Sequence, residues 1–271
     1  RPGHRAPKLA PLVAGDDEVL ISSWVKIDSD NQVTLIAAHS EMGQGTHTAL
    51  VQMLADELDS RWVDTHFMEA PAVDAYANGA LGKGFLAGDM DFPRILVPTI
   101  DGAFQQIADL MHLQITGGSS SVRATGVHGV RVAGAAAREM LLRAAADSWG
   151  VPLGELSARD SQVVHAASGR SAPFAEFATA AAAFKPSATP QLKTQEQFRV
   201  MGTHRPRRDI PSKVDGSARF GIDAEVPGMK YAAIVAAPVF GATLESVDSA
   251  AAMAMTNMEK TYPANWSTFS P

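Results

Sequence analysis

Cysteine is absent from all 271 residues of the sequence. The chain therefore forms no disulfide, ligates no iron–sulfur cluster through cysteine and offers no catalytic thiol. This absence leaves the cellular compartment open, because proteins outside the cytoplasm can also lack cysteine.

Charge is scarce as well. Asp, Glu, Lys and Arg together make up 19% of the chain, and the net charge at pH 7 is -6. Binding to a nucleic-acid backbone requires clustered Lys and Arg. The one basic cluster, THRPRRDIPSK at residues 203–213, is interrupted by prolines. We interpret it as a connector and expect no nucleic-acid partner.

Long apolar runs and several familiar motifs are also missing. No run reaches about 18 apolar residues, so the sequence predicts no membrane-spanning helix. The motifs GxSxG, GxxxxGK[ST] and GxGxxG do not occur, which leaves serine hydrolases and standard nucleotide-binding folds without support. The eight histidines show none of the usual metal-ligand spacings, so we predict no metal site within this chain.

With 271 residues, 46% of them hydrophobic, the chain is long enough for one large domain or two modest ones. The expected elements are both strands and helices, and we predict an α+β fold. Residues 19–27 and 32–38 read as two strands around a turn. A first glycine loop at residues 41–45 (EMGQG) then opens a helix over residues 46–58. A further strand is expected within residues 61–70.

Later segments alternate between irregular and periodic stretches. We predict, in order, an irregular segment at 71–99, helices at 98–113 and 122–149, and a strand, a turn and a helix ending near residue 184. The predicted boundaries are a cofactor-binding domain portion at 1–190, a proline-rich linker at 191–212 and a second unit with β-like runs at 213–271.

A second glycine loop, ITGGSSSVR at residues 115–123, opens the long predicted helix. Both glycine loops precede helices, where free N–H groups and the helix dipole favour anions, and glycine lets a ligand approach the main chain. The ordinary alternatives are a strand-to-helix turn for Gly43 and Gly45, and an N-cap for the serines. The candidate binding residues are Gly43, Gln44, Gly45, Thr46, Gly117, Gly118, Ser119, Ser120, Ser121, Val122 and Arg123.

Three segments in order carry a resemblance to a known family. EMGQGTHTALVQMLADEL, GGSSSVRATG with the helix that follows, and IPSKVDGSARFGIDAEVPGMKYAAIVAAPVFGATLESVD resemble the molybdopterin-binding large subunits of the xanthine oxidase family. The resemblance is strongest to the branch of isoquinoline 1-oxidoreductase β-subunits and periplasmic aldehyde dehydrogenases. The third segment is similar to the start of the family's hammerhead α/β domain.

The resemblance implies a molybdenum ion on molybdopterin, in its cytosine dinucleotide form. Gln44 is then expected to hydrogen-bond an oxygen ligand of molybdenum or the pterin edge, and Gly117 to Arg123 to hold the pyrophosphate. The implied reaction is oxidative hydroxylation of an aldehyde to its acid, or else of an N-heteroaromatic ring. The implied location is the periplasm, either free or associated with the membrane through a partner subunit.

The resemblance also implies partner subunits. An iron–sulfur small subunit with [2Fe-2S] clusters would accept the electrons, and a cytochrome c subunit with haem c, or quinone, would follow.

The sequence departs from the family in three respects. The family's general base is a glutamate in a Gly-Glu motif, and Glu41, Glu57 and Glu69 lie in a different context, so we predict no catalytic residue in this chain. The chain is shorter than the family's large subunits, and residues 256–271 do not continue the family pattern. We therefore expect another chain or segment to complete the subunit and to pack against the region from Ala251 onward. The alternative is a non-catalytic scaffold subunit.

Overall fold

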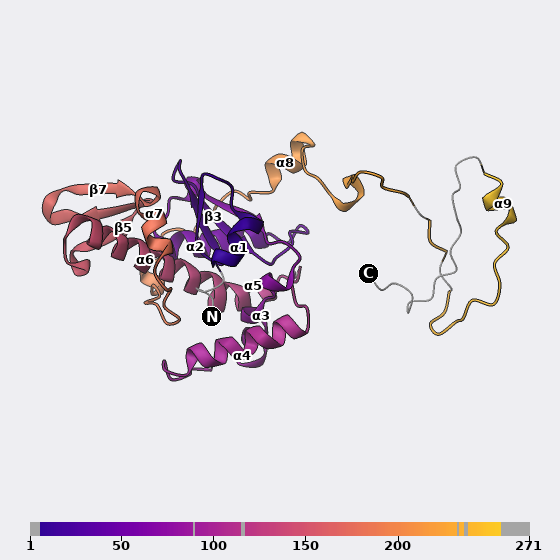
Figure 1. Ribbon diagram of the computed structural model, residues 1–271, viewed down its shortest axis with the longest axis horizontal. Coiled ribbons are helices and arrows are strands. Elements are labelled where there is room, and N and C mark those ends of the chain that lie inside the picture. The colour runs from indigo at the N-terminus through magenta and orange to yellow at the C-terminus, as the bar shows by residue number, and fades with distance from the viewer. Residues whose placement is uncertain (1–5, 89, 115–116, 232, 236–237, 256–271) are drawn as a thin grey trace. The chain divides into compact units, whose positions relative to one another are not determined.

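The computed structural model describes residues 6–88, 90–114, 117–231, 233–235 and 238–255. The chain divides into two compact units, Arg1–Ala218 and Arg219–Pro271. Figure 1 shows that the helices and sheets belong almost entirely to the first unit. Among the described residues, no helix is both long enough and apolar enough to cross a bilayer.

A four-stranded sheet forms the centre of the first unit, with the order β1-β2-β3-β4. Its strands are β1 (Glu18–Ser22), β2 (Val25–Asp28), β3 (Val33–Ala37) and β4 (Thr65–Glu69). The first three strands are antiparallel neighbours, whereas β4 runs parallel to β3. A parallel pair requires a crossover, and helix α2 (Thr46–Leu58) provides it. The sheet and its helices make this an α+β unit, as predicted.

The prediction of one strand over residues 19–27 was wrong. The chain turns at Ser23 and Trp24, and Ser22 pairs with Val25, so the segment forms the β1–β2 hairpin. The turn contains neither glycine nor proline, and Ser22 and Ser23 are only a weak signal in the sequence. Folding back buries both apolar runs in one core, where Ile21 and Val25 are at most 1% exposed.

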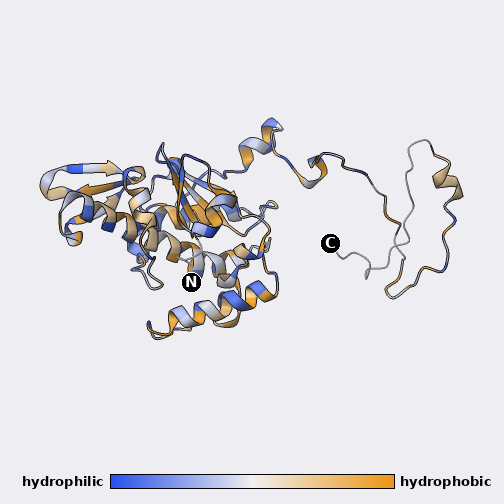
Figure 2. Ribbon diagram, viewed as in Figure 1, coloured by the Kyte–Doolittle hydropathy of each residue, from blue (hydrophilic) through white to orange (hydrophobic). Residues whose placement is uncertain are grey.

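Helices α2, α6 (Arg131–Trp149) and α7 (Phe174–Ala182) pack against the sheet and one another. Leu50, Leu54, Leu141, Phe174 and Phe177 are at most 2% exposed, and Figure 2 shows the apolar residues concentrated in the central strands. The predicted helix at 122–149 is built from α5 (Ser121–Thr125), a π-helical turn (Gly126–Val130) and α6.

The small residues along this helix admit α2 at close range. A Cβ placed on Gly134 would lie 3.0 Å from the Glu57 Cβ atom. Close packing of small residues therefore joins the helix after the first glycine loop to the helix after the second.

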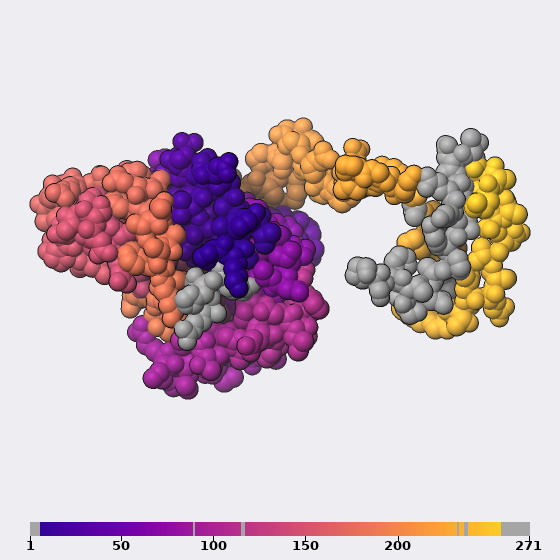
Figure 3. Space-filling view, in the orientation of Figure 1, coloured from indigo at the N-terminus to yellow at the C-terminus, as the bar shows by residue number. Residues whose placement is uncertain are grey.

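Two helices occupy the edge of the unit that appears magenta in Figure 3. Helix α4 (Val97–Leu110) was predicted, whereas α3 (Gly79–Leu86) lies where an irregular segment was expected. Three glycines give α3 a weak helical signal, and packing overrides it. Gly84 brings α3 so close to α5 that an added Cβ would lie 2.2 Å from the Ala124 Cβ atom.

The remaining elements of the first unit flank the sheet. Helix α1 (Ala6–Val13) packs Leu9 against Leu20 and Ile36. No helix was predicted here, because the segment contains two prolines. A three-stranded antiparallel sheet consists of β5 (Leu156–Arg159), β6 (Gln162–His165) and β7 (Arg170–Pro173). The short 3-10 helices are η2 (Trp62–Asp64), η3 (Asp74–Tyr76), η5 (Leu153–Glu155), η6 (Ala166–Ser168) and η7 (Gln195–Gln197).

Residues 191–212, the predicted linker, lie along the first unit and remain within it. The carboxylate of Asp56, which is 2% exposed, accepts hydrogen bonds from the backbone amides of Arg199, Val200 and Met201 at 2.6–3.2 Å. Helix α8 (Ile210–Asp215) follows. The linker is therefore tied to the core of the first unit through α2.

The second unit contains little regular structure. Its elements are η8 (Gly221–Asp223) and α9 (Ala250–Met253), and no strand forms among its described residues, contrary to the β-like runs predicted there. A β-run needs a hydrogen-bonded neighbour to become a strand, and the described runs of this unit have none. Residues 256–271, whose sequence departs from the family pattern, lie outside the described residues.

Candidate functional site

The first glycine loop connects the end of β3 to the start of α2. Gly43 and Gly45 have φ values of +99° and +85°, a left-handed conformation that side chains other than glycine rarely adopt. A Cβ at either position would meet no heavy atom within 4 Å. The backbone conformation, and not crowding, therefore requires glycine at both positions.

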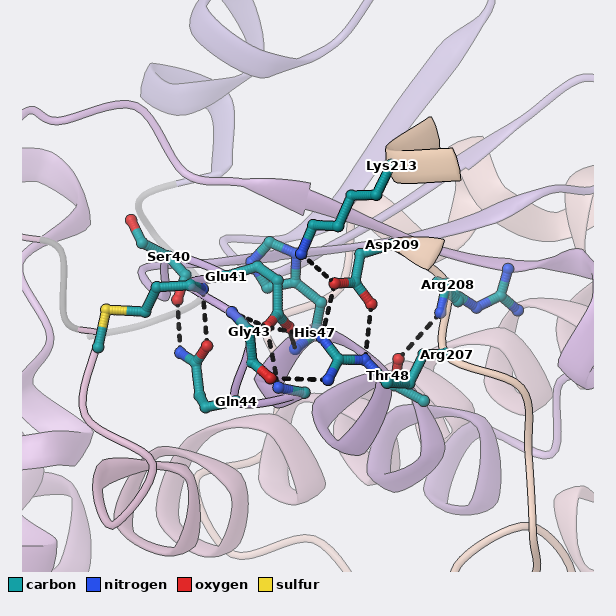
Figure 4. A network of polar contacts seen from close by, with 12 residues as sticks. Ser40, Glu41, Gly43, Gln44, His47, Thr48, Arg207, Arg208, Asp209 and Lys213 are labelled. Carbon is teal, nitrogen blue, oxygen red and sulfur yellow. Dashed lines mark hydrogen bonds and ion pairs between the residues drawn. The ribbon is translucent and has the colours of Figure 1, made fainter. Parts of the chain in front are cut away.

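Glu41 occupies the anion position that the sequence pattern indicated at this loop. Its carboxylate accepts hydrogen bonds from the amides of Gly43 (3.0 Å), Gly45 (2.8 Å) and His47 (3.3 Å) (Figure 4). Burial raises the pKa of Glu41, but the amide hydrogen bonds outweigh it and hold that pKa below its ordinary value. The free N–H groups at the start of α2 thus already have an anionic partner within the chain.

Gln44 connects the two glycine loops. Its Nε2 group donates to the carbonyl oxygens of Ser40 (2.7 Å) and Gly117 (2.9 Å), and its Oε1 atom accepts from the Met42 amide (2.7 Å). Both amide protons are used, so among the described contacts only one lone pair on Oε1 is left for a ligand. Gln44 can accept a hydrogen bond from a ligand, whereas donating one requires the loss of an existing contact.

The second glycine loop is more open than the first. Gly118, Ser119 and Ser120 are exposed, and among the described residues the Ser119 and Ser120 hydroxyls have no hydrogen-bond partner. Ser121 is buried, and its hydroxyl donates to the Gly118 carbonyl, which closes the first turn of α5. Two exposed hydroxyl donors therefore remain in the described part of this loop.

Thr46 begins α2 directly after Gly45. Its side chain is 1% exposed, and the Oγ1 atom has no hydrogen-bond partner among the described residues. An unpaired buried hydroxyl is costly. Of the predicted site residues, Thr46 is the one that leaves a buried polar atom unsatisfied, at the point where the main chain turns into α2.

A buried polar network joins the flanks of the two loops. His39, at the end of β3, makes a 2.9 Å hydrogen bond through Nε2 to the Thr125 hydroxyl on α5, which also accepts from Asn78 at 3.0 Å. Burial, together with the nearby His47, lowers the pKa of His39 from 6.5 to about 4. The neutral imidazole therefore persists well below pH 6.5.

Not every predicted site residue lies at the junction of the loops. Val122 packs against the hydrophobic core, and Arg123 is exposed on α5. Gly43 to Thr46 and Gly117 are brought together through Gln44, and Ser119 and Ser120 lie two and three residues further along. No sequence pattern indicated the contributions of Glu41, His39 and Arg207.

Arg207 comes from the proline-rich segment and contacts the first glycine loop directly. Its guanidinium group donates to the Gly43 carbonyl at 2.7 Å and lies 3.3 Å from the Glu41 carboxylate (Figure 4). No local pattern signals this contact, because 164 residues separate Arg207 from Gly43.

The three glutamates considered as general bases have other partners. Glu57 is fully buried and pairs with Arg131 at 2.6 Å, while Glu69 accepts from the Ser40 hydroxyl at 2.7 Å. Glu41 is bound by backbone amides, as described above. These contacts give each glutamate a structural role. Within the described residues, no group of three or more metal-ligating side chains is placed to hold an ion.

Comparisons with known proteins give a consistent result. Residues 9–80, which include the first glycine loop, match the family described as the molybdopterin cofactor-binding domain. The β-subunit of isoquinoline 1-oxidoreductase from Brevundimonas diminuta is 31% identical over an alignment that covers 84% of this chain. A nicotinate dehydrogenase subunit of Pseudomonas putida is 26% identical over 82% of the chain.

A third relative, the membrane-bound aldehyde dehydrogenase [pyrroloquinoline-quinone] of Gluconacetobacter polyoxogenes, is 27% identical over 90% of the chain. The alignments cover 30%, 16% and 28% of the three relatives, respectively. The chain therefore spans less than a third of the length of each.

Proposed function

Because the chain belongs to the xanthine oxidase family of molybdopterin-binding proteins, we propose that it supplies part of the cofactor site of a molybdenum-dependent oxidoreductase. The observation that carries the proposal is the contact of Gln44 with Gly117, which brings the two glycine loops together from positions 73 residues apart. A site for a large cofactor needs several main-chain surfaces close together, and this contact creates one.

The residues present fit a molybdenum–pterin group. The exposed hydroxyls of Ser119 and Ser120 suit a phosphate or pyrophosphate, and the described part of the second loop holds no internal carboxylate that would compete. The first loop leaves open space beside Gly43 and Gly45, and Thr46 offers an unsatisfied hydroxyl. Since Glu41 already satisfies the first loop's amides, we assign the phosphate to the second loop and the pterin edge to the first.

The chain's own residues then have distinct roles. Ser119 and Ser120 would donate to the phosphate oxygens, and the Gln44 Oε1 atom would accept from an N–H group of the pterin. When bound, the molybdenum–pterin group would supply a two-electron oxidising centre. We propose the cytosine dinucleotide form, because a nucleotide extension adds the pyrophosphate that the serine loop suits.

We favour an N-heteroaromatic substrate, oxidised by hydroxylation at an electron-poor ring carbon. Two of the three relatives are named for N-heteroaromatic compounds, and one of these has the highest identity of the three. Aldehyde oxidation to the acid is the second candidate, because the relative named as an aldehyde dehydrogenase covers the largest share of this chain. Comparing turnover of isoquinoline or nicotinate with that of an aliphatic aldehyde by the purified complex distinguishes them.

We further propose that a different polypeptide segment or chain supplies the general base and the electron acceptors. A general-base glutamate would come from a segment or chain that completes the large subunit, and a [2Fe-2S] subunit would accept the electrons. A cytochrome c subunit carrying haem c, or quinone, would follow, and the complex would lie in the periplasm. Co-purification, haem staining and cell fractionation test these parts separately.

Metal analysis of the natively purified protein tests the central proposal. We expect about one molybdenum per chain by elemental mass spectrometry, together with a pterin nucleotide released by acid. No molybdenum in an intact complex would favour the scaffold role instead.

The variant Gln44→Ala should lower molybdenum and pterin content, because the two loops lose their bridge. Gln52→Ala is the matched control, since Gln52 also donates to two backbone carbonyls, those of Val200 and Thr203, and makes no hydrogen bond with the described residues of either loop. Equal content in the two variants would contradict the role given to Gln44.

A further inference from the structure

Three charged residues, Arg207, Asp209 and Lys213, form a network that contacts the first glycine loop through Arg207 (Figure 4). We call this network the clamp. It lies in the stretch that the sequence analysis interpreted as a simple connector. The stretch does connect two parts of the chain, but three of its charged side chains are engaged in one network that ends on the loop. The proposed function leaves this network unexplained.

The clamp has a defined order of contacts. Asp209 accepts from Arg207 through both carboxylate oxygens, at 3.0 Å from Nε and 2.6 Å from Nη2, and Lys213 donates to the same carboxylate at 2.5 Å. The two-point contact orients the planar guanidinium group. Arg207 can then reach the Gly43 carbonyl at 2.7 Å and the Glu41 carboxylate at 3.3 Å.

The loop needs such a restraint for a physical reason. Gly43 and Gly45 have no side chains, and no atom lies within 4 Å of a Cβ placed on either. No side chain of their own anchors these residues, and glycine loses more backbone freedom on ordering than any other residue. The loop is held from within by Glu41 and Gln44, and from outside by Arg207.

Charge also connects the clamp to the loop. Glu41 is 7% exposed, and Arg207, which is 35% exposed, is the cation that pairs with it. The hydrogen bonds to Arg207 hold the pKa of Asp209 well below its ordinary value, so the clamp stays charged throughout the neutral range. The carboxylate that caps α2 is therefore balanced by a cation from a distant part of the chain.

We propose that Arg207 is a positioning residue for the first glycine loop, and that it acts by holding the Gly43 carbonyl and the Glu41 carboxylate in place. Through Gln44, the restraint extends to the second glycine loop. The consequence for cofactor retention rests on the proposed function, whereas the consequence for loop order does not.

Hydrogen–deuterium exchange of the natively purified protein tests the proposal. In Arg207→Gln, the amides of residues 43–47 should exchange about tenfold faster, since two charge-assisted contacts are lost. Amides of the β5–β7 sheet should be unchanged, because a loss of global stability would affect both regions. Arg207→Lys should restore little, since a lysine cannot make the two-point contact with Asp209.

Arg205→Gln is the matched control. Arg205 lies in the same segment and contacts the Thr203 hydroxyl and the Trp62 ring, and among the described contacts it has none with the loop. Its exchange pattern at residues 43–47 should equal that of the unmodified protein. Unchanged exchange at these residues in Arg207→Gln, or an equal increase in Arg205→Gln, would overturn the proposal.

Asp209→Asn provides an independent test if Arg207→Gln fails to accumulate. The asparagine keeps one acceptor for Arg207 but loses the negative charge and the pairing with Lys213. Exchange of the amides of residues 43–47 should therefore rise by a smaller factor than in Arg207→Gln. No rise would count against the clamp.

Pterin content, measured in the same preparations, separates this proposal from the proposed function. Faster loop exchange with lowered pterin content supports both. Faster loop exchange in a protein that never contains pterin supports the clamp and contradicts the proposed function.

Discussion

Each of the two glycine loops contains two glycines and precedes a helix, yet the structure gives them different states. In the first loop, Glu41 accepts from the Gly43 and Gly45 amides, Gln44 donates to the Ser40 carbonyl and Arg207 donates to the Gly43 carbonyl. The second loop presents Ser119 and Ser120 as exposed donors. A glycine-rich loop before a helix can therefore be a receptor for an anion or already contain one, and a nearby carboxylate decides which.

The largest expected difference between the loops comes from Glu41→Gln. An amide can accept fewer hydrogen bonds than a carboxylate and brings its own N–H group toward three backbone donors. The free energy of unfolding should fall by about 2 kcal/mol, because three exposed or partly buried amides lose a charged acceptor. Urea denaturation measures it. Glu155→Gln, at a half-exposed glutamate paired with His165, should cost less than about 1 kcal/mol. Similar losses for the two variants would show that the first loop does not depend on its carboxylate.

The network between the two loops should make stability depend on pH. The pKa of His39 is about 4 in the folded protein and 6.5 in a free chain. Between these values the unfolded chain binds a proton that the folded protein does not, so stability falls as the pH falls. The expected loss between pH 7 and pH 5 is about 2 kcal/mol.

Denaturation curves of the unmodified protein and of His39→Asn across this range check the prediction. The His39→Asn variant should be less stable at pH 7 but show a flatter pH profile. A variant at the exposed His204 should retain the slope. An unaltered slope in His39→Asn would assign the pH dependence to other groups.

A pair of alanine variants compares how strongly the backbone conformation of each loop requires glycine. Gly45→Ala places a side chain at φ +85° and should cost about 1–2 kcal/mol. Gly118 has no positive φ, and its added Cβ would meet only ordinary contacts at 3.7 Å and beyond, so Gly118→Ala should cost about 0.5 kcal/mol or less. Thermal unfolding of the two proteins measures the difference. If Gly118→Ala were the more damaging, the second loop would be the more constrained one.

The smallest effect on stability is expected from Ser119→Ala combined with Ser120→Ala. Both hydroxyls are exposed, so the free energy of unfolding should change by about 0.5 kcal/mol or less. Pterin content should nevertheless fall, because the proposed phosphate donors are gone. Normal pterin content in this double variant would move the phosphate away from the second loop.

Local sequence patterns predicted the elements whose signal lies within a few residues. The periodicity of residues 46–58 and 122–149 predicted the two principal helices, and the glycines marked the loops before them. The split of β1 from β2 was missed because the turn at Ser23 and Trp24 contains neither glycine nor proline, and serine alone is a weak turn signal. Helix α3 was missed because its glycines, which lower helix propensity, serve close packing against α5.

By itself, the sequence determined that two glycine-containing loops precede helices, and that the chain resembles molybdopterin-binding subunits. Only the tertiary structure decided what each loop holds. Gln44 meets Gly117 across 73 residues, and Arg207 meets Gly43 across 164. The physical reason is that hydrogen bonds and ion pairs depend on distances of about 3 Å in space. Short-range spacing encodes a helix or a turn, but a contact between distant segments exists only once the core has brought them together.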